Sequence, residues 1–232
     1  MRSLFVDLAQ VFVPKLCLGC RRSLPTSLPQ LCLECLEKLP ETHYEQFPDN
    51  PLYRLINKRV AIAEATTLYF FEKEGLLQKL IHLLKYKGQY KIGVFFGQIL
   101  GGKMATSKRV TYSLVVPVPL HKKRQRKRGY NQMVGFAKAL AQHLNIPYSD
   151  KLLIRHKPTK TLVQMTQTER WTQVHDAFEV RNTNTLKGHH VLLVDDVVTT
   201  GATLSAVVQC LTACEGVLVS VAAIGFAQSP LP

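Results

Sequence analysis

Apolar residues at positions 59–232 recur in two patterns that alternate along the chain. Short runs of β-branched and aromatic residues, such as Leu68–Phe71 and His190–Val194, are typical of buried strands. Longer segments carry apolar residues three or four positions apart, which is typical of amphipathic helices. We expect strands at 60–71, 113–118, 152–155, 190–194 and 217–224, and helices at 75–85, 91–104, 131–144 and 201–214. Strands that alternate with helices predict an α/β fold, with a parallel sheet covered by helices on both faces.

The first 58 residues follow a different pattern, dominated by two pairs of cysteines. Cys17 and Cys20 form one pair, Cys32 and Cys35 form the other, and each pair brackets two residues. This is the spacing of zinc knuckles, in which four thiolates complete a closed tetrahedral site. Two disulfide bonds are the alternative, but nothing else in the sequence indicates an oxidising compartment. We therefore predict a small zinc-ribbon module.

A segment rich in proline, asparagine and charged residues, 41–57, separates these two patterns. Such a composition is typical of a linker between folded units. We therefore divide the chain into a zinc-ribbon module with its linker at 1–58 and an α/β domain at 59–232.

The composition narrows the range of partners. Hydrophobic residues make up 46% of the chain and charged residues 20%, which is the balance of a folded protein. No apolar run approaches the roughly 20 residues that a membrane-spanning helix needs, so we expect no stable membrane span and a cytoplasmic location. The formal net charge of +14 favours polyanionic partners, which are nucleic acid, an anionic membrane surface or a phosphorylated small molecule.

The most informative segment follows the apolar run at 191–194. Two carboxylates, Asp195 and Asp196, stand where that predicted strand ends, at the edge of the sheet where α/β proteins bind ligands. A turn of small residues then leads into a helix, and its members are Thr199, Thr200, Gly201, Ala202 and Thr203. Free amides at the helix start and three hydroxyls predict a phosphate site. The two acids would face the sugar hydroxyls of the ligand or a bound Mg²⁺ ion.

A strongly basic segment occupies 122–128, where six of seven residues are cationic. It follows a strand that ends in prolines, so we expect a mobile loop that closes over an anionic ligand. A solvated charged face and a nucleic-acid patch are the alternatives. Lys85, close to Gly88, and Arg128 are two cations that we expect near that ligand.

The segment Val191–Leu204 closely resembles the phosphoribosyl pyrophosphate signature of type I phosphoribosyltransferases. That resemblance implies that the turn 199–203 holds the 5-phosphate. It also implies that Asp195 and Asp196 contact the ribose hydroxyls and help to position a magnesium diphosphate. Lys85 and Arg128 would then meet the diphosphate, with the basic segment as its lid.

The order of motifs along the chain resembles the ComF-type competence proteins, which pair a phosphoribosyltransferase-like domain with an N-terminal zinc module. The motifs are the paired cysteines, LLKYKG, PVPLH with RGYNQ, and VLLVDDVVTTGATL. A segment at 167–178 also matches, although Gln173 stands where the family has asparagine. The resemblance implies a type I phosphoribosyltransferase-like fold and a role in natural transformation, handling internalised single-stranded DNA with other competence proteins.

Two functional hypotheses follow. In the first, a phosphoribosyl pyrophosphate-binding protein serves competence, and Tyr86, Tyr130 and Trp171 stack on the bases of single-stranded DNA. In the second, the chain is an active magnesium-dependent phosphoribosyltransferase whose acceptor the sequence does not reveal.

Overall fold

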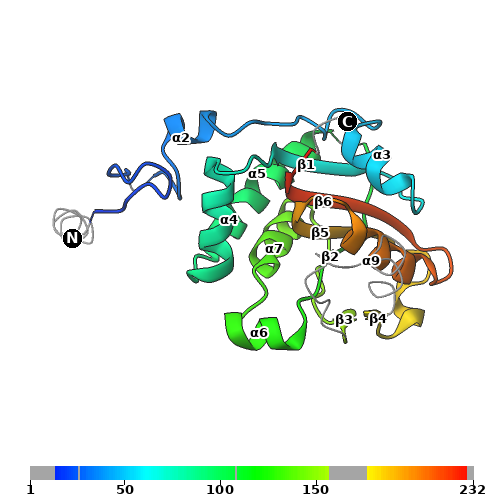
Figure 1. Cartoon of the computed structure of the whole chain (residues 1–232). Coiled ribbons are helices and arrows are strands. Elements are labelled where there is room, and N and C mark those ends of the chain that lie inside the picture. The colour runs from blue at the N-terminus through cyan, green and yellow to red at the C-terminus, as the bar shows by residue number, and fades with distance from the viewer. Residues whose placement is uncertain (1–13, 26, 108, 157–176, 229–232) are drawn as a thin grey trace.

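A central parallel sheet organises the chain. The computed structural model describes residues 14–25, 27–107, 109–156 and 177–228. Four strands lie in the order β1 (Ala65–Phe70), β6 (Leu218–Phe226), β5 (His190–Val198) and β2 (Leu114–Pro117), and every pairing between them is parallel. Figure 1 shows these strands side by side at the centre of the molecule. The predicted parallel α/β sheet is confirmed.

Helices cover both faces of this sheet because its central strands are apolar on both sides. In β5, Leu192 and Val194 belong to one hydrophobic core, while Val191 and Leu193 belong to the other, as side chains that alternate along a strand require. One face carries α4 (Leu76–Tyr86), α5 (Lys91–Ser107) and α7 (Met133–Leu144), and the other carries α3 (Pro51–Asn57) and α9 (Ala202–Thr212) (Figure 1). None of the helices in the described ranges is long and apolar enough to cross a membrane.

A separate antiparallel hairpin pairs β3 (Leu153–Arg155) with β4 (Phe178–Val180), and a short 3-10 helix, η2 (Thr183–Leu186), follows it. The strand expected at 152–155 is therefore present, but it lies outside the central sheet. Most of the segment 167–178, including Gln173 and Trp171, falls outside the described residues.

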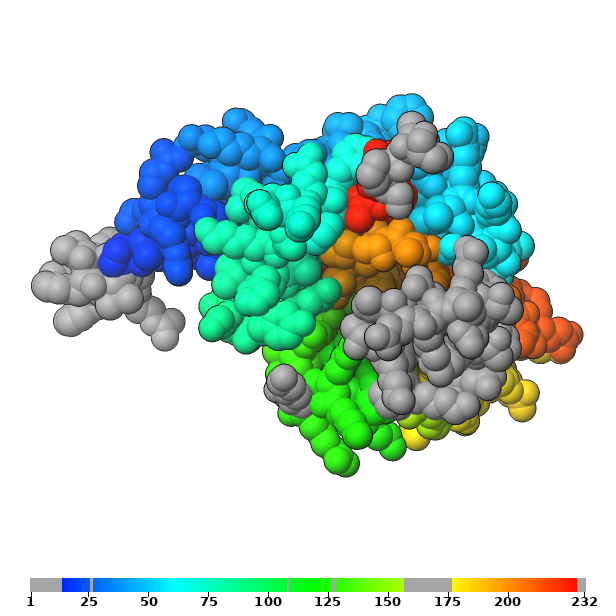
Figure 2. Space-filling model, in the orientation of Figure 1, coloured from blue at the N-terminus to red at the C-terminus, as the bar shows by residue number. Residues whose placement is uncertain are grey.

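The N-terminal module is small and contacts the N-terminal part of α4. It contains a single short helix, α2 (Leu33–Glu37), in the described residues before α3. Lys79 of α4 donates a hydrogen bond to the carbonyl of Gly19 over 2.6 Å. The module forms a lobe that projects beside α4 (Figure 2).

The linker prediction is wrong for the second half of 41–57, because residues 51–57 form helix α3. Asn50 caps this helix by accepting a hydrogen bond from the amide of Tyr53, and Pro51 occupies the first helical position, where its missing amide costs nothing. Leu52 and Ile56 are fully buried against the sheet. Proline and asparagine in this segment therefore start a helix.

The basic segment is also not a loop, because residues 122–128 form helix α6 (Lys122–Arg128). The ring of His121 accepts a hydrogen bond from the amide of Lys123 at the helix start. Gly129, with φ of +81°, provides the left-handed residue that ends it. A helix presents its cations in fixed directions, so part of this charge points towards the sheet edge and part away from it.

Close contact between α5 and α7 depends on glycine. A Cβ atom at Gly97 would lie 2.6 Å from the carbonyl oxygen of Phe136 and 2.8 Å from the Cβ of Ala139. These distances are too short for any side chain, so the two helices approach each other backbone to backbone.

We expect Gly97→Ala to destabilise the fold by about 1–3 kcal/mol, because the extra methyl group overpacks a rigid interface. Gly102→Ala in the same helix is the control, since nothing lies within 4 Å of its Cβ position. That variant should raise stability by roughly 0.5–1 kcal/mol through helix propensity. Urea unfolding of both variants measures the difference, and equal midpoints would contradict this account of the interface.

Candidate functional site

The segments that carry the predicted chemistry meet at the carboxyl edge of the sheet. The turn after β5 and the loop between β2 and α6 both leave from this edge, as parallel pairing of the two strands requires. Strand β5 continues through Val198, four residues beyond the predicted end at 194. Asp195 and Asp196 therefore lie within the strand and point in opposite directions, and the turn begins at Thr199.

The turn 199–201 forms a small cradle at the start of α9. Gly201 has φ of +71°, and the helix begins with Ala202, so the first amides of α9 have no partner within the helix. A cavity of about 50 Å³ is lined by Asp195 and by residues 197–204. This is far below the roughly 300–1,000 Å³ of a site for a whole ligand, so the cradle suits one small group such as a phosphate. Thr199, Thr200, Gly201, Ala202 and Thr203 all contribute to it, as predicted.

Arg59 adds a positive charge beside this cradle. Its guanidinium donates a hydrogen bond to the carbonyl oxygen of Thr200 and would lie 3.5 Å from a Cβ atom at Gly201. The sequence analysis missed this residue, since it stands 141 positions from Thr200 in no recognisable motif.

Asp196 is buried, with 6% of its surface exposed, and forms a network with residues from other elements. Its Oδ1 atom accepts a hydrogen bond from Lys85 Nζ over 2.7 Å, and its Oδ2 atom accepts one from Gln132 Nε2 over 2.7 Å. The sequence predicts that both acids face the ligand, whereas in this structure the Asp196 carboxylate faces Lys85 and Gln132. Successive residues of a strand point to opposite faces, so only one of two adjacent acids can face the open edge.

Asp195 is the acid that lines the cradle. Burial, followed by repulsion from Asp196, raises the pKa of Asp195 to about 7. A hydrogen bond of 2.8 Å from the amide of Asp196, together with Lys85 and Arg155, partly opposes this rise. Asp195 therefore changes its charge close to neutral pH.

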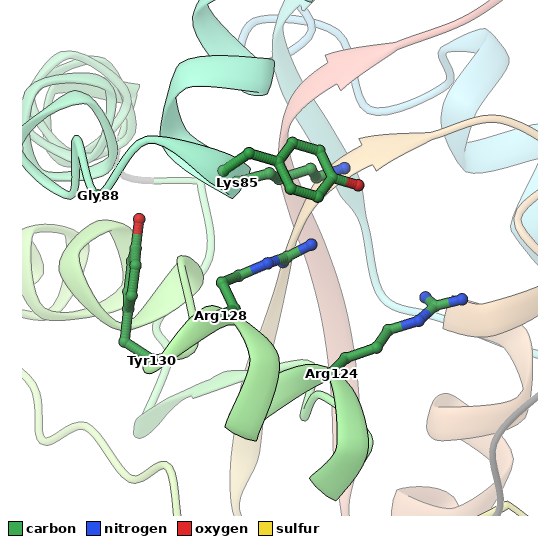
Figure 3. Close-up of a pocket in the computed structure, with 6 residues that line it drawn as sticks. Lys85, Gly88, Arg124, Arg128 and Tyr130 are labelled. Atoms are coloured by element: carbon green, nitrogen blue, oxygen red, sulfur yellow. The ribbon is translucent and has the colours of Figure 1, made fainter.

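A second cavity, of about 450 Å³, opens beside the acids and contains three cations. Lys85 comes from the end of α4, and Arg124 and Arg128 come from α6 (Figure 3). Arg128 packs over the ring of Tyr86 at 5.2 Å and donates a hydrogen bond to Gln132. The structure thus brings together Lys85 and Arg128, as predicted, and adds Arg124.

Arg155 is a further cation that the sequence analysis missed. It lies on β3, is buried, and packs over the ring of Phe178 at 5.1 Å. Burial, followed by repulsion from Arg124, lowers the pKa of Arg155, while Asp195 opposes the shift. The hairpin thus contributes a positive charge near Asp195. A single arginine in a three-residue strand gave no signal in the sequence.

The four cysteines of the N-terminal module form one cluster. The Sγ atoms of Cys17, Cys20, Cys32 and Cys35 lie within 4.8 Å of one another, and all four thiols are free. Two Sγ–Sγ distances are 3.7 Å, close to the roughly 3.8 Å between sulfurs on a tetrahedron of radius 2.3 Å. The amide of Cys32 also donates a hydrogen bond to the Cys17 sulfur over 3.4 Å. This donor set can hold a metal ion.

Comparison with known proteins agrees with this geometry. The phosphoribosyl transferase domain family matches residues 133–227, which include both acids and the turn after β5. The chain is 33% identical over 137 residues to "Competence protein F" of Haemophilus influenzae, and 29% identical over 139 residues to "DNA utilization protein YhgH" of Escherichia coli. These alignments cover 56% and 58% of this chain, and 59% and 60% of the two relatives.

A longer alignment relates the chain to "Competence protein ComFC" of Bacillus subtilis. It is 27% identical over 198 residues and covers 85% of this chain and 78% of the relative. Among solved structures, adenine phosphoribosyltransferase from Leishmania tarentolae overlaps 68% of this chain and 90% of its own, with 14% identity and a TM-score of 0.39.

The sheet, the domain match and the turn after β5 define a phosphoribosyltransferase-like protein. The relatives support the closer resemblance found in the sequence, because the chain is similar to competence proteins of the ComF type.

Proposed function

We propose that the chain binds phosphoribosyl pyrophosphate with Mg²⁺ at the carboxyl edge of its sheet, as a cytoplasmic protein of natural competence that handles single-stranded DNA. The observation that carries the first part is the convergence at one edge of three features. These are the cradle at 199–204, the carboxylate of Asp195 and the cavity with Lys85, Arg124 and Arg128. Phosphoribosyl pyrophosphate has three groups that need these environments. They are the 5-phosphate, a sugar with vicinal hydroxyls and the diphosphate.

Each part of the ligand has a matching partner. The cradle is small, lies at a helix start and has Arg59 beside it, which suits the 5-phosphate. Asp195 can accept hydrogen bonds from the ribose hydroxyls. The three cations of the larger cavity suit the diphosphate.

Mg²⁺ prefers carboxylate and phosphate oxygens, and Asp195 offers such a carboxylate in the cradle. When bound, the ion would neutralise part of the diphosphate charge. Asp196 has a different part, since its two hydrogen bonds hold Lys85 and Gln132 in place.

Handling of single-stranded DNA is supported by the exposed cations of α6. Lys122, Lys123 and Arg126 are exposed and do not line the cation cavity, so they are available to a long polyanion. The names of the relatives, which refer to competence and DNA utilization, point the same way.

The second candidate function is transfer of the phosphoribosyl group to an acceptor. The cavity with Lys85, Arg124 and Arg128 favours it, because clustered cations stabilise the charge that develops as diphosphate departs. Residues that would recognise an acceptor are not evident in the described parts of the chain.

We further propose that the cysteine cluster holds zinc in a structural role. The sulfur distances and the absence of disulfide bonds among these four cysteines support it. The module has little core of its own, so the metal would supply much of its folding energy.

The first prediction concerns Asp195 and pH. We expect Mg²⁺-dependent binding of phosphoribosyl pyrophosphate to weaken as pH falls through about 7, because protonation removes the carboxylate. The Asp195→Asn variant should lose the magnesium dependence of phosphoribosyl pyrophosphate binding at pH 8. Its affinity for phosphoribosyl pyrophosphate should also change less with pH than that of the wild type. The variant should remain folded, because it removes a charge that burial disfavours. Titration calorimetry between pH 6 and 8 measures both.

Asp150→Asn is the control, since Asp150 is exposed and lies outside the cradle. Wild-type magnesium dependence in Asp195→Asn would mean that the acid is misassigned.

The second prediction concerns the metal. The purified chain should contain about one zinc ion, as expected for a four-cysteine site. Cys32→Ser should lower the metal content and the solubility together, whereas Cys210→Ser, outside the cluster, should change neither. Elemental analysis gives the result. A folded, zinc-free wild-type chain would end this proposal.

The third prediction separates the two sets of cations on α6. Replacing Lys122, Lys123 and Arg126 with Gln should weaken the binding of single-stranded DNA. The slope of log affinity against log salt concentration should also become less steep by up to roughly 2, because each phosphate contact contributes about 0.7 to it. Affinity for phosphoribosyl pyrophosphate should stay unchanged. Replacing Arg124 and Arg128 with Gln should instead lower that affinity at least about tenfold, since each charge-assisted hydrogen bond contributes roughly 1.5–3 kcal/mol.

Fluorescence anisotropy measures DNA binding and calorimetry measures ligand binding. If both sets of substitutions affect the two ligands equally, the assignment of the two sides of α6 is wrong.

A further inference from the structure

The turn between α4 and α5 interleaves cations with aromatic rings. The sequence from Lys85 to Lys91 reads Lys-Tyr-Lys-Gly-Gln-Tyr-Lys, and Tyr86 and Tyr90 are 62% and 54% exposed. Lys85 and Tyr86 line the cation cavity described above, whereas Tyr90 does not line it. Exposed rings between lysines are typical of surfaces that bind single-stranded nucleic acid.

Tyr90 lines a groove next to the cation cavity. This groove has a volume of about 870 Å³ and lies between the α4–α5 turn, the end of α6 and the outer side of α7. The two cavities share Gly88, Arg128 and Tyr130, so these residues separate one from the other. In Figure 1 the ends of α4, α6 and α7 are close together on one side of the sheet.

The lining of the groove matches the parts of a nucleotide. Tyr90 and Tyr130 offer aromatic faces, and Tyr130 is held in position by a hydrogen bond from its hydroxyl to the carbonyl of Leu84. A ring that is already fixed loses little entropy when a base stacks on it. Val94 and Val134 supply an apolar floor, and the side-chain amides of Gln125 and Gln142 can hydrogen-bond to base edges.

Charge favours a phosphate-bearing occupant. Arg128 and Lys138 line the groove against one acid, Asp150. Lys87 and Lys91 are exposed on the adjoining turn. Gln125 belongs to α6, whose exposed cations continue outward from the groove, so a charged path runs from the helix into it.

We propose that this groove binds a segment of single-stranded DNA, with a base stacked on Tyr90 and a phosphate on Lys138. The proposal rests on the DNA-handling part of the proposed function and assigns its location. A strand fits better than a free nucleotide, because the cationic path along α6 extends beyond the groove. The shared wall at Arg128 and Tyr130 then places a bound base next to the phosphoribosyl pyrophosphate cavity.

The test measures the affinity of a labelled single-stranded oligonucleotide of roughly 12 nucleotides by fluorescence anisotropy. Tyr90→Ala should weaken binding about 5- to 100-fold, the range measured for loss of one stacked base. Tyr90→Phe keeps the ring and should bind like wild type. Lys138→Gln should flatten the salt slope by about 0.7. All three variants should retain wild-type affinity for phosphoribosyl pyrophosphate, because neither residue lines that cavity.

Matched controls lie on other parts of the surface. Phe47 is 55% exposed and precedes α3, and Lys58 is exposed at the end of that helix, so Phe47→Ala and Lys58→Gln should leave DNA binding unchanged. Equal losses in the controls and in the groove variants would overturn the proposal.

Two other results would also overturn it. If Tyr90→Ala binds DNA normally while the Lys122, Lys123 and Arg126 variant does not, DNA handling stands but the groove is not its site. If free mononucleotide competes with an affinity equal to that of the oligonucleotide, the groove takes a small molecule and not a strand. A wild-type chain without DNA affinity would instead refute the DNA-handling function itself, and the groove proposal with it.

Discussion

The site depends on the buried carboxylate of Asp196. It accepts hydrogen bonds from Lys85 and Gln132, which lie on α4 and directly before α7, and thereby joins two helices to the central strand. Gln132 in turn accepts a hydrogen bond from Arg128, so the end of α6 is held by the same network. Removing one partner of a buried ion pair typically costs about 3–5 kcal/mol, because the other charge is left without compensation. Asp196 therefore fixes two of the three cations of the larger cavity, Lys85 directly and Arg128 through Gln132.

This network also explains why two adjacent acids behave differently. Strand geometry sends Asp196 into the protein, where Lys85 offsets its charge, and leaves Asp195 at the cradle. Burial, followed by repulsion from Asp196, then raises the pKa of the Asp195 carboxyl more than Lys85 and Arg155 lower it. Asp196 thus anchors Lys85 and Gln132, and Asp195 is the acid at the ligand cradle.

Local patterns in the sequence predicted most of the fold and the central part of the site. The strand, turn and helix around Asp195 and Gly201 are contiguous, so a phosphate site could be predicted from them directly, and the cysteine spacing indicated that the four thiols would cluster. Contacts between distant segments could not be read in this way. Lys85 and Asp196 are 111 residues apart, and Arg59 and Arg155 reach the site only through the arrangement of other elements. The helix α6 was missed because a segment without apolar residues has no apolar periodicity, and its capping by His121 and Gly129 depends on backbone geometry.

The two outer strands of the sheet are both covered by extended backbone. Residues 40–42 lie antiparallel to β1, where the amide of Thr42 bonds to the carbonyl of Leu68 and the amide of Phe70 to that of Pro40. On the other side, the backbone around Tyr148 pairs with Val115 of β2. An open sheet edge is a template for pairing with other chains. A fragment shortened to residues 59–232 would lose the first of these covers, and its bare β1 edge would promote aggregation even if every residue of the ligand site were retained.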